Sequence, residues 1–447
     1  MIIRLVVLSF LLIAPCALSA SVVSRYLPSF SSSVLQVSDL SSPRPAFTLS
    51  SIFVQASKSS PLVDDQYEMY KFDGLLEMNG WYDLHEMVAA TKEARPGYVS
   101  PFVRETGANS LAARQLLFGA QSSVTGYAVE LGAQAPLGEF LRVGFSLPLW
   151  HVEARQRYAF PVVAADQLVS EPQREQAQRL RQMLHQDLGL VQKDWLVNNV
   201  GDGSAWAEVS RAWHAWWLLR TMEWACRLTI TAPTGPVEDQ AYPSSFALGN
   251  GGSWGFGVSL QPRFEVKECV WVQAPVSVTV QTSNTRLRRL PVYAEPMPFG
   301  ALHAIVKTTP GLTINVEPSL TLQHFIDNLH LFFGFSWTKH YADTLVDCSA
   351  SSATASYLTR TSLPSSSFGA TLSAVDQRNR LAVERDNKRA HTAWRRTYFM
   401  FGAQYELADI FPSIKYAPTF NIGINYCIGQ HHAAKMHQMT AGFSWRF

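Results

Sequence analysis

The chain has 447 residues, of which 47% are hydrophobic and 16% charged, and its formal net charge is +2. This composition is too apolar for a disordered chain, and nucleic-acid binding would need a much stronger basic excess. After the first residues the chain has no apolar run of about eighteen residues or more, which argues against membrane-spanning helices.

The N-terminus has the features of a secretory signal. Arg4 precedes an apolar run over residues 5–14, and a small-residue cleavage site follows at residues 17–20. This order of charge, apolar stretch and small residues is typical of a cleaved signal peptide. The sequence therefore predicts export and removal of residues 1–19.

Residues 20–110 carry the weakest pattern, with Ser- and Pro-rich segments around short apolar stretches. We interpret them as an N-terminal periplasmic or plug segment that includes a first strand. Three stretches are candidates for that strand, namely residues 49–55, 67–72 and 98–104.

From residue 124 onward, apolar and polar residues alternate. Tyr127, Val129 and Leu131 interleave with Gly126 and Glu130, for example, and such alternation places the two kinds of residue on opposite faces of a strand. The pattern predicts strands over residues 124–133, 142–149, 205–217, 222–231, 254–265, 270–280, 312–322, 329–337, 399–407, 420–426 and 437–447.

One of these segments is irregular. In residues 205–217 the charged Arg211 falls on the same face as Val209 and Trp213. We therefore expect a β-bulge or a changed register in this segment.

The connections between the segments alternate in length. Those at residues 136–139, 218–221, 267–268, 325–328 and 408–412 are short, and those at 151–203, 233–253, 283–311, 342–393 and 427–436 are longer. This pattern requires residues 301–308 to be a loop or the extension of one long strand. Short turns at one end and long loops at the other are typical of outer-membrane β-barrels.

The last strand places Phe443, Trp445 and Phe447 on one face and ends the chain on an aromatic residue. It resembles the terminal strand of bacterial outer-membrane β-barrels, in which a C-terminal aromatic is the recognition signal for the insertion machinery. The resemblance implies that outer-membrane lipid and this machinery are partners. We predict an all-β protein, a transmembrane antiparallel β-barrel of about 12 strands over residues 111–447, with 14 strands as the alternative.

A second resemblance concerns glycine-rich turns. Gly201-Asp202-Gly203, a strand hairpin, the stretch Ala232-Pro233-Thr234-Gly235 and the Gly-rich residues 249–257 resemble aromatic-compound and fatty-acid uptake channels. This implies a hydrophobic substrate. The Asn-Pro-Ala element near the mature N-terminus of the fatty-acid channels is absent, so no binding residue is carried over.

One helix is predicted in the long extracellular loop before residue 203. Ser170 and Gln173 form a capping box, Leu180, Leu184 and Leu188 recur on one face, and Gly189 follows. It is either a surface helix that packs on its own loop, or a lid over the barrel mouth or a constriction folded into it.

Polar residues on the inner face are candidates to line the lumen. They are Glu130, Arg142, Glu223, Arg227, Arg263, Glu265, Asn315, Glu317 and Glu406. Glu223 with Arg227, and Arg263 with Glu265, lie two or four residues apart on one face, where they are placed to form a ladder of charges.

The sequence favours neither a metal site nor an enzyme. His431, His432 and His437 follow Cys427, but no carboxylate lies at ligand spacing, and the cysteines lack the paired spacing of a zinc site. No Gly-x-Ser-x-Gly motif occurs. We expect no cofactor. Cys348 and Cys427 fall in predicted outer loops, where they are candidates for a disulfide.

These features together indicate an outer-membrane channel or transporter for passive uptake of small nutrients, hydrophobic ones if the second resemblance holds. The alternative is a structural or surface-interaction barrel, similar to an adhesin. Its lumen would be closed, and the loops at residues 154–203 and 343–392 would be its working parts.

Overall fold

A computed structural model describes residues 45–59, 80–83, 117–159, 171–214, 219–290, 299–300, 302–326, 328–348, 392–407, 418–431 and 433–446. The expected signal peptide, most of the N-terminal segment and most of the loop at residues 343–392 lie outside these residues.

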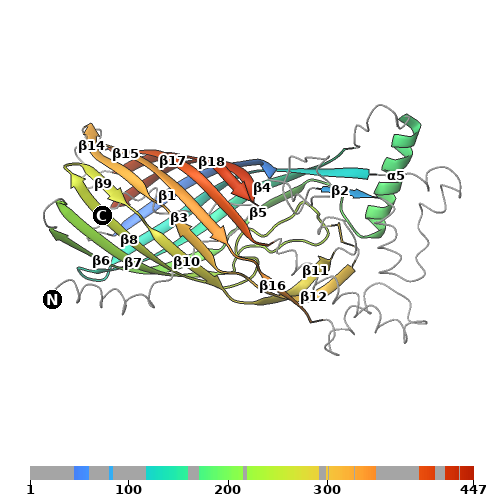
Figure 1. The fold of residues 1–447 in the computed structure, drawn as a ribbon, viewed down its shortest axis with the longest axis horizontal. Helices are drawn as coiled ribbons and strands as arrows, with labels where there is room; N and C mark the ends of the chain where they lie inside the picture. Colours follow the sequence, from blue (N-terminus) through green and yellow to red (C-terminus); the bar gives the residue numbers. More distant parts are fainter. Residues whose placement is uncertain are drawn as a thin grey trace.

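The described strands close into an antiparallel barrel with twelve strand positions (Figure 1). Nine positions are single strands: β1 (Ala46–Ser59), β3 (Leu117–Pro136), β4 (Leu141–Ala159), β7 (Thr221–Ala232), β8 (Gly255–Lys267), β15 (Leu329–His340), β17 (Trp394–Glu406), β18 (Thr419–His431) and β19 (Ala434–Arg446). Three are strand pairs in series: β5 (Trp195–Val200) with β6 (Gly203–His214), β9 (Val270–Gln273) with β10 (Val276–Gln281), and β13 (Thr313–Val316) with β14 (Ser319–Ile326).

The barrel closes between the first and last strands, because β1 pairs with both β3 and β19. The prediction of about 12 strands is therefore confirmed. The first strand contains residues 49–55, one of the three candidate stretches, and the other eleven positions coincide with the alternating segments.

Proline explains two of the three interrupted positions. Pro275 lies between β9 and β10, and Pro318 lies between β13 and β14. A proline has no backbone N–H to donate to a neighbouring strand, so the ladder breaks there. Both prolines still accept through their carbonyl oxygens, from Glu317 N and Phe335 N at 2.9 Å.

The outer surface of the barrel is apolar. On β1 the side chains of Phe47, Leu49 and Phe53 are 40–47% exposed, whereas Ile52 between them is 1% exposed. On β19 Phe443 and Trp445 are exposed in the same way, and Phe447 lies outside the described residues. An apolar surface that encircles a closed barrel is suited to lipid, not to water.

The apolar band ends on the outer part of β4. Phe145 and Leu149 are exposed on its outward face, but farther along the same face Glu153 and Arg155 form an ion pair at 2.8 Å. Residues 153–159 of β4 therefore extend past the apolar band.

The short turns gather at the end of the barrel that holds the C-terminal end of β19. Several of them contain a left-handed residue, with φ of +119° at Gly138, +63° at Cys269 and +61° at Asn328. One expected connection differs in length, because β18 ends at His431 and β19 begins at Ala434. The connection expected at residues 408–412 lies outside the described residues.

The expected bulge near Arg211 is wrong. Strand β6 pairs with β7 in continuous register from Gly203 opposite Ala232 to His214 opposite Thr221. Arg211 stays on the exposed face near the short turns, with its guanidinium carbon 5.8 Å from the Phe140 ring and 5.4 Å from the Trp213 ring. A long cationic side chain is tolerated there because it can reach the polar interface.

The opposite, outer end carries additional structure (Figure 1). A separate three-stranded sheet contains β11 (Asn284–Leu290), β12 (Leu302–Thr309) and β16 (Thr344–Asp347), and β2 (Gly80–Asp83) pairs with the start of β3. Strand β12 of this separate sheet comes before β13, with residues 310–312 between them, so residues 302–308 are a strand and not a loop.

The predicted helix is α5 (Glu171–Asp187), and it lies at this outer end. It ends at Asp187 and is followed by Gly189, whose φ is +69°. Leu190 N donates to His185 O at 2.8 Å, and Gly189 N donates to Gln186 O at 2.9 Å. This is the Schellman arrangement, which satisfies the last carbonyl groups of a helix.

Leu180 and Leu184 of α5 and Leu188 directly after it are buried, as their spacing predicts. The guanidinium carbon of Arg181 lies 3.7 Å from the centre of the Tyr158 ring, and the ring of His185 lies 5.4 Å from that of Phe299. We call α5, the three-stranded sheet, Tyr158 and Phe299 the outer cap. The helix thus packs on Tyr158 of β4 and on Phe299, and not only on its own loop.

The candidate disulfide does not form. Cys348 and Cys427 are not bonded to each other, and Cys427 belongs to β18, where it is buried beside Phe332, Tyr398 and Met400. Cys427 lies on the inward face of the barrel, since its neighbour Ile428 is exposed on the outward face.

Candidate functional site

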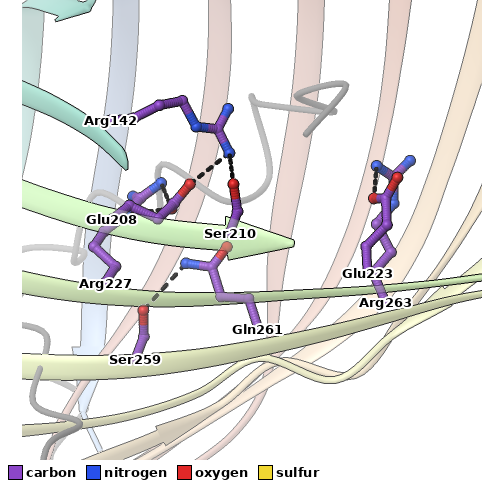
Figure 2. Close-up of polar contacts among 8 residues, drawn as sticks. All are labelled: Arg142, Glu208, Ser210, Glu223, Arg227, Ser259, Gln261 and Arg263. Atoms are coloured by element: carbon purple, nitrogen blue, oxygen red, sulfur yellow. Dashed lines mark hydrogen bonds and ion pairs between the residues drawn. The ribbon is translucent and has the colours of Figure 1, made fainter. Parts of the chain in front are cut away.

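The inner face of the barrel holds a cluster of buried charges on four adjacent strands (Figure 2). Glu208 of β6 lies between two arginines: its Oε1 is 2.6 Å from Arg142 Nη2, and its Oε2 is 2.7 Å from Arg227 Nη2. Ser210 lies within 3.4 Å of the same Arg142 nitrogen. Both carboxylate oxygens of Glu208 are thus held by guanidinium groups.

A second ion pair lies beside the first. Arg263 Nη1 of β8 is 3.1 Å from Glu223 Oε2 of β7, and each side chain is 6% exposed. We call Arg142, Glu208, Arg227, Glu223 and Arg263 the ion-pair cluster. Three guanidinium groups face two carboxylates, which leaves a formal charge of +1.

Two inward-facing tryptophans complete the cluster. The guanidinium of Arg227 lies over Trp206 at 4.3 Å, and that of Arg263 lies over Trp271 at 4.2 Å. A buried charge is tolerated only when it is paired and hydrogen-bonded, and an aromatic face stabilises a cation further. Each of these two arginines therefore has a carboxylate on one side and a ring on another.

These ion pairs run from strand to strand: Arg142 and Arg227 with Glu208, and Arg263 with Glu223. The sequence analysis had placed its charge ladder along single strands. Side chains directly opposite on paired strands are nearer than side chains two residues apart on one strand, which favours the cross-strand geometry. Glu208 opposes Arg227, and Glu223 opposes Arg263.

The remaining lumen candidates also lie on the inward face. Ser50 donates to Glu130 at 3.4 Å, Thr221 donates to Glu265 at 2.8 Å, and His330 lies 3.5 Å from Glu406. Each carboxylate therefore has a polar neighbour on an adjacent strand.

Asn315 of β13 and Glu317, which follows β13, belong to a second polar group, which they form with residues of the neighbouring strand β15. Asn315 Nδ2 donates to Glu317 Oε1 at 2.8 Å, and Ser336 Oγ lies 3.3 Å from the same oxygen. Thr338 donates to Asn315 Oδ1 at 2.9 Å. Two neutral side chains, those of Asn315 and Ser336, thus donate hydrogen bonds to the carboxylate of Glu317.

Nearer the outer end, three polar residues lie in a row. Thr313 Oγ1 is 2.7 Å from His340 Nδ1, and His340 Nε2 is 2.9 Å from Asp343 Oδ1. Asp343 also accepts from the backbone N–H of Gly311 at 2.8 Å. The row ties the outer ends of β13 and β15 to the segment that follows β15.

The outer half of the lumen differs from this polar region, because part of its wall is apolar. Its inward side chains come from β1, β3, β4, β5 and β19 and are almost completely buried. They are Ile52, Val54, Ala56, Val124, Ala128, Trp150, Val152, Ala154, Trp195 and Met436, which we call the apolar wall.

The connection between β7 and β8 covers the apolar wall. Phe246 and Leu248 of this connection belong to the same buried cluster, and Tyr242 packs against it. We call residues 233–254 the mouth loop. Because it folds against the inner face, it occupies part of the outer half of the lumen.

Asp202, between β5 and β6, holds the mouth loop. Its Oδ1 accepts from Gly235 N at 2.8 Å, and its Oδ2 accepts from Asn250 N. A Cβ atom on Gly249 would collide with this carboxylate, so the close approach requires glycine there. Thr234 adds a hydrogen bond to Gly201 O at 2.7 Å.

Sequence reasoning missed several of these residues. Glu208 shares one face of β6 with Trp206 and Ser210, and this spacing of two would have identified it as inward-facing. The sequence interpretation of this strand rested on Arg211, which lies on the opposite face. Phe246 and Leu248 lie in an irregular loop, where no periodicity marks a residue as inward-facing. Asp202 was noted only as part of a turn.

The described residues contain no helix that is both long and apolar enough to cross a membrane. They also contain no group of three or more His, Cys, Asp or Glu side chains that could bind a metal ion.

Comparison with known proteins gives similarity in structure alone. No protein-family model matches the chain, and no curated protein matches it. Similar solved structures include an outer membrane channel from Pseudomonas putida F1, with a TM-score of 0.43, 9% identity, and coverage of 92% of this chain and 99% of that one.

Two others are the translocator domain of the autotransporter NalP from Neisseria meningitidis and the Pseudomonas putida toluene transporter TodX. For NalP the TM-score is 0.36, the identity 9%, and 93% of each chain is covered. For TodX the values are 0.31, 10% and 96% of each chain. At these identities the likeness lies in the barrel fold.

Proposed function

We propose that the protein is a channel of the bacterial outer membrane through which small nutrients, including somewhat hydrophobic ones, cross passively. The observation that carries this proposal is a closed barrel whose outside is apolar and whose inside holds the ion-pair cluster and the polar group around Glu317. If the barrel had only a structural role, an interior filled with apolar side chains would make it equally stable. Buried ion pairs rarely stabilise a protein more than well-packed apolar residues do.

The outer membrane is the proposed location. Lipid would cover the apolar band that contains Phe53 and Phe443, and β19, which ends in alternating aromatics, would be the segment that the insertion machinery recognises. The expected signal peptide at residues 1–19 would direct export and then be removed. Processing is testable by mass determination of the mature protein.

Planar-bilayer recordings of the refolded protein test the channel. We expect discrete conductance steps, and flux of small uncharged solutes into liposomes that contain the protein. The same preparation after boiling is the control, since folded barrels migrate differently from boiled ones on a denaturing gel. Heat-modifiable protein that gives neither conductance nor flux would refute the channel.

The second candidate function is a surface-interaction barrel with a closed lumen. The mouth loop against the apolar wall and the outer cap above it favour this alternative. Replacing residues 160–194, which include α5, with a short linker separates the two functions. A channel would still conduct, whereas an adhesin would lose binding to its partner surface.

A further inference from the structure

The inward face of β1 changes character along its length. Thr48 and Ser50 point inward near the short turns, and Ile52, Val54 and Ala56 follow on the same face toward the outer end. Apolar side chains that face a water-filled lumen would be costly, so this region needs a cover. In the structure the cover is the mouth loop.

The mouth loop presents an aromatic ring to the apolar wall. The ring centre of Phe246 lies 5.2 Å from that of Trp195, and the two planes are tilted by 59°. Trp150 and Val152 of β4 belong to the same buried cluster. This tilted arrangement is a favourable one for two aromatic rings, so the wall is shaped to hold a ring of this size.

The polar contacts of the mouth loop lie at its two stems and at its tip. At the stems Asp202 binds the backbone N–H groups of Gly235 and Asn250, and Leu248 N donates to Pro236 O at 3.1 Å. Asn284 Nδ2 donates to Gly251 O at 3.0 Å. Asp202 thus ties the two stems to each other through one carboxylate.

At the tip the mouth loop is tied to the outer cap. Val191 N, just after α5, donates to Ala241 O at 2.7 Å, and Arg289 of β11 donates through its backbone and side chain to Gln240 at 2.7 Å. The tip is therefore held by the outer cap, whereas the segment from Phe246 to Asn250 is held by the apolar wall and by Asp202.

We propose that the mouth loop is a displaceable gate, and that the apolar wall beneath Phe246 is a binding site for small uncharged molecules that carry an aromatic ring or a short alkyl group. The chemistry of the ligand follows from the wall, which offers tryptophan and aliphatic surfaces and no charge among its ten residues. Phe246 occupies the site when no ligand is bound. This inference rests on the proposed channel for its role in transport.

Fluorobenzene is the probe, and the refolded full chain in nanodiscs is the sample. Saturable binding is followed by the fluorine resonance of the probe, and the mouth loop is followed by hydrogen exchange of peptides that cover residues 241–253. We expect exchange in the mouth loop to rise as the probe binds, because the probe and Phe246 compete for one place. Exchange in β17 and β18 serves as the internal reference.

The variant Asp202→Asn tests whether the mouth loop is a displaceable gate or a fixed part of the barrel interior. It weakens the contact at the stems but removes no apolar atom, so the apolar wall stays intact. Loss of a charge-assisted hydrogen bond changes an opening equilibrium by about tenfold or more. We therefore expect about tenfold faster exchange in the mouth loop without probe, and tighter binding of fluorobenzene. Asp194→Asn is the matched control, since the carboxylate of Asp194 accepts from the backbone N–H of Gln156 in β4 and not from the backbone of the mouth loop.

The outcomes separate the two proposals. If the probe fails to bind, or binds without faster exchange in the mouth loop, or if Asp194→Asn behaves like Asp202→Asn, the gate is refuted even when the barrel conducts. If binding and exchange respond as expected but no conductance or flux is found, the site stands and the channel fails.

Discussion

The guanidinium of Arg289 donates a hydrogen bond from Nη2 to the carbonyl oxygen of Leu188 at 2.8 Å, which joins β11 to the end of α5. The same side chain donates to Gln240 O at 2.7 Å and to Gly300 O at 3.1 Å. One arginine thus connects the helix, the tip of the mouth loop and the β11–β12 connection.

Replacing this arginine should loosen the outer cap while the barrel stays folded. In Arg289→Ala three carbonyl groups, two of them on buried residues, lose a charged donor, and we expect a local loss of about 2–3 kcal/mol or more. Limited proteolysis and hydrogen exchange should show faster opening of α5 and of residues 239–242. Arg179→Ala is the control, because Arg179 is exposed and lies 4.0 Å from Glu175. Unchanged protection in α5 would contradict this role of Arg289.

Acid should loosen the same cap through His185. Burial and the charges of Arg181 and Arg289 hold the pKa of His185 well below its usual value, so the folded cap keeps the ring neutral. Tyr158 also faces it at 5.4 Å, and burial raises the pKa of that phenol to about 12, so it stays neutral as well. A depressed histidine pKa stabilises the folded form above the unfolded value of about 6.5, and this contribution is lost as pH falls below it.

We therefore expect α5 to become more susceptible to proteolysis between about pH 6.5 and pH 5, after correction for the pH dependence of the protease on an unfolded substrate. In His185→Phe the ring packing is retained without a titrating group, so the pH dependence should shrink. An α5 equally protected at pH 5 and pH 7.5 would rule out this effect of His185.

Breaking the ion-pair cluster should change both stability and ion selectivity. Glu208→Gln leaves Arg142 and Arg227 without their shared carboxylate, and removing one partner of a buried pair costs about 3–5 kcal/mol. Urea unfolding in detergent measures this loss. In bilayers the reversal potential under a salt gradient should shift toward anion selectivity, since the local charge becomes more positive. Glu153→Gln, whose pair with Arg155 lies outside the lumen, should leave both readouts near wild type.

The cost of a charge on the outer face should depend on depth. Ile424 of β18 is exposed within the apolar band, and a lysine at the middle of a bilayer costs about 2–4 kcal/mol. We expect Ile424→Lys to lower the folded fraction on heat-modifiability gels and in urea titrations. Glu153→Lys, past the band on β4, should cost much less. Equal effects at the two sites would contradict the assigned lipid-facing band.

How far the sequence predicted the structure can be seen from particular residues. The alternation of Phe443 and Trp445 with polar neighbours predicted an exposed apolar face, because a strand repeats every two residues whatever it pairs with. The spacing of Leu180, Leu184 and Leu188, with Gly189 after them, predicted α5 for the same local reason. Arg211 misled the analysis, since a charge near the end of a lipid-facing strand needs no bulge.

Only the tertiary structure showed that Glu208 lies between Arg142 and Arg227, because strand register decides which side chains face one another and register is a long-range property. The same holds for Phe246, which an irregular loop brings against Trp195, and for Asp202, which binds groups more than thirty residues away. The sequence by itself determined a barrel and its two faces, because periodicity is local. The tertiary structure decided what fills the barrel, because contacts between distant segments depend on the closed shape.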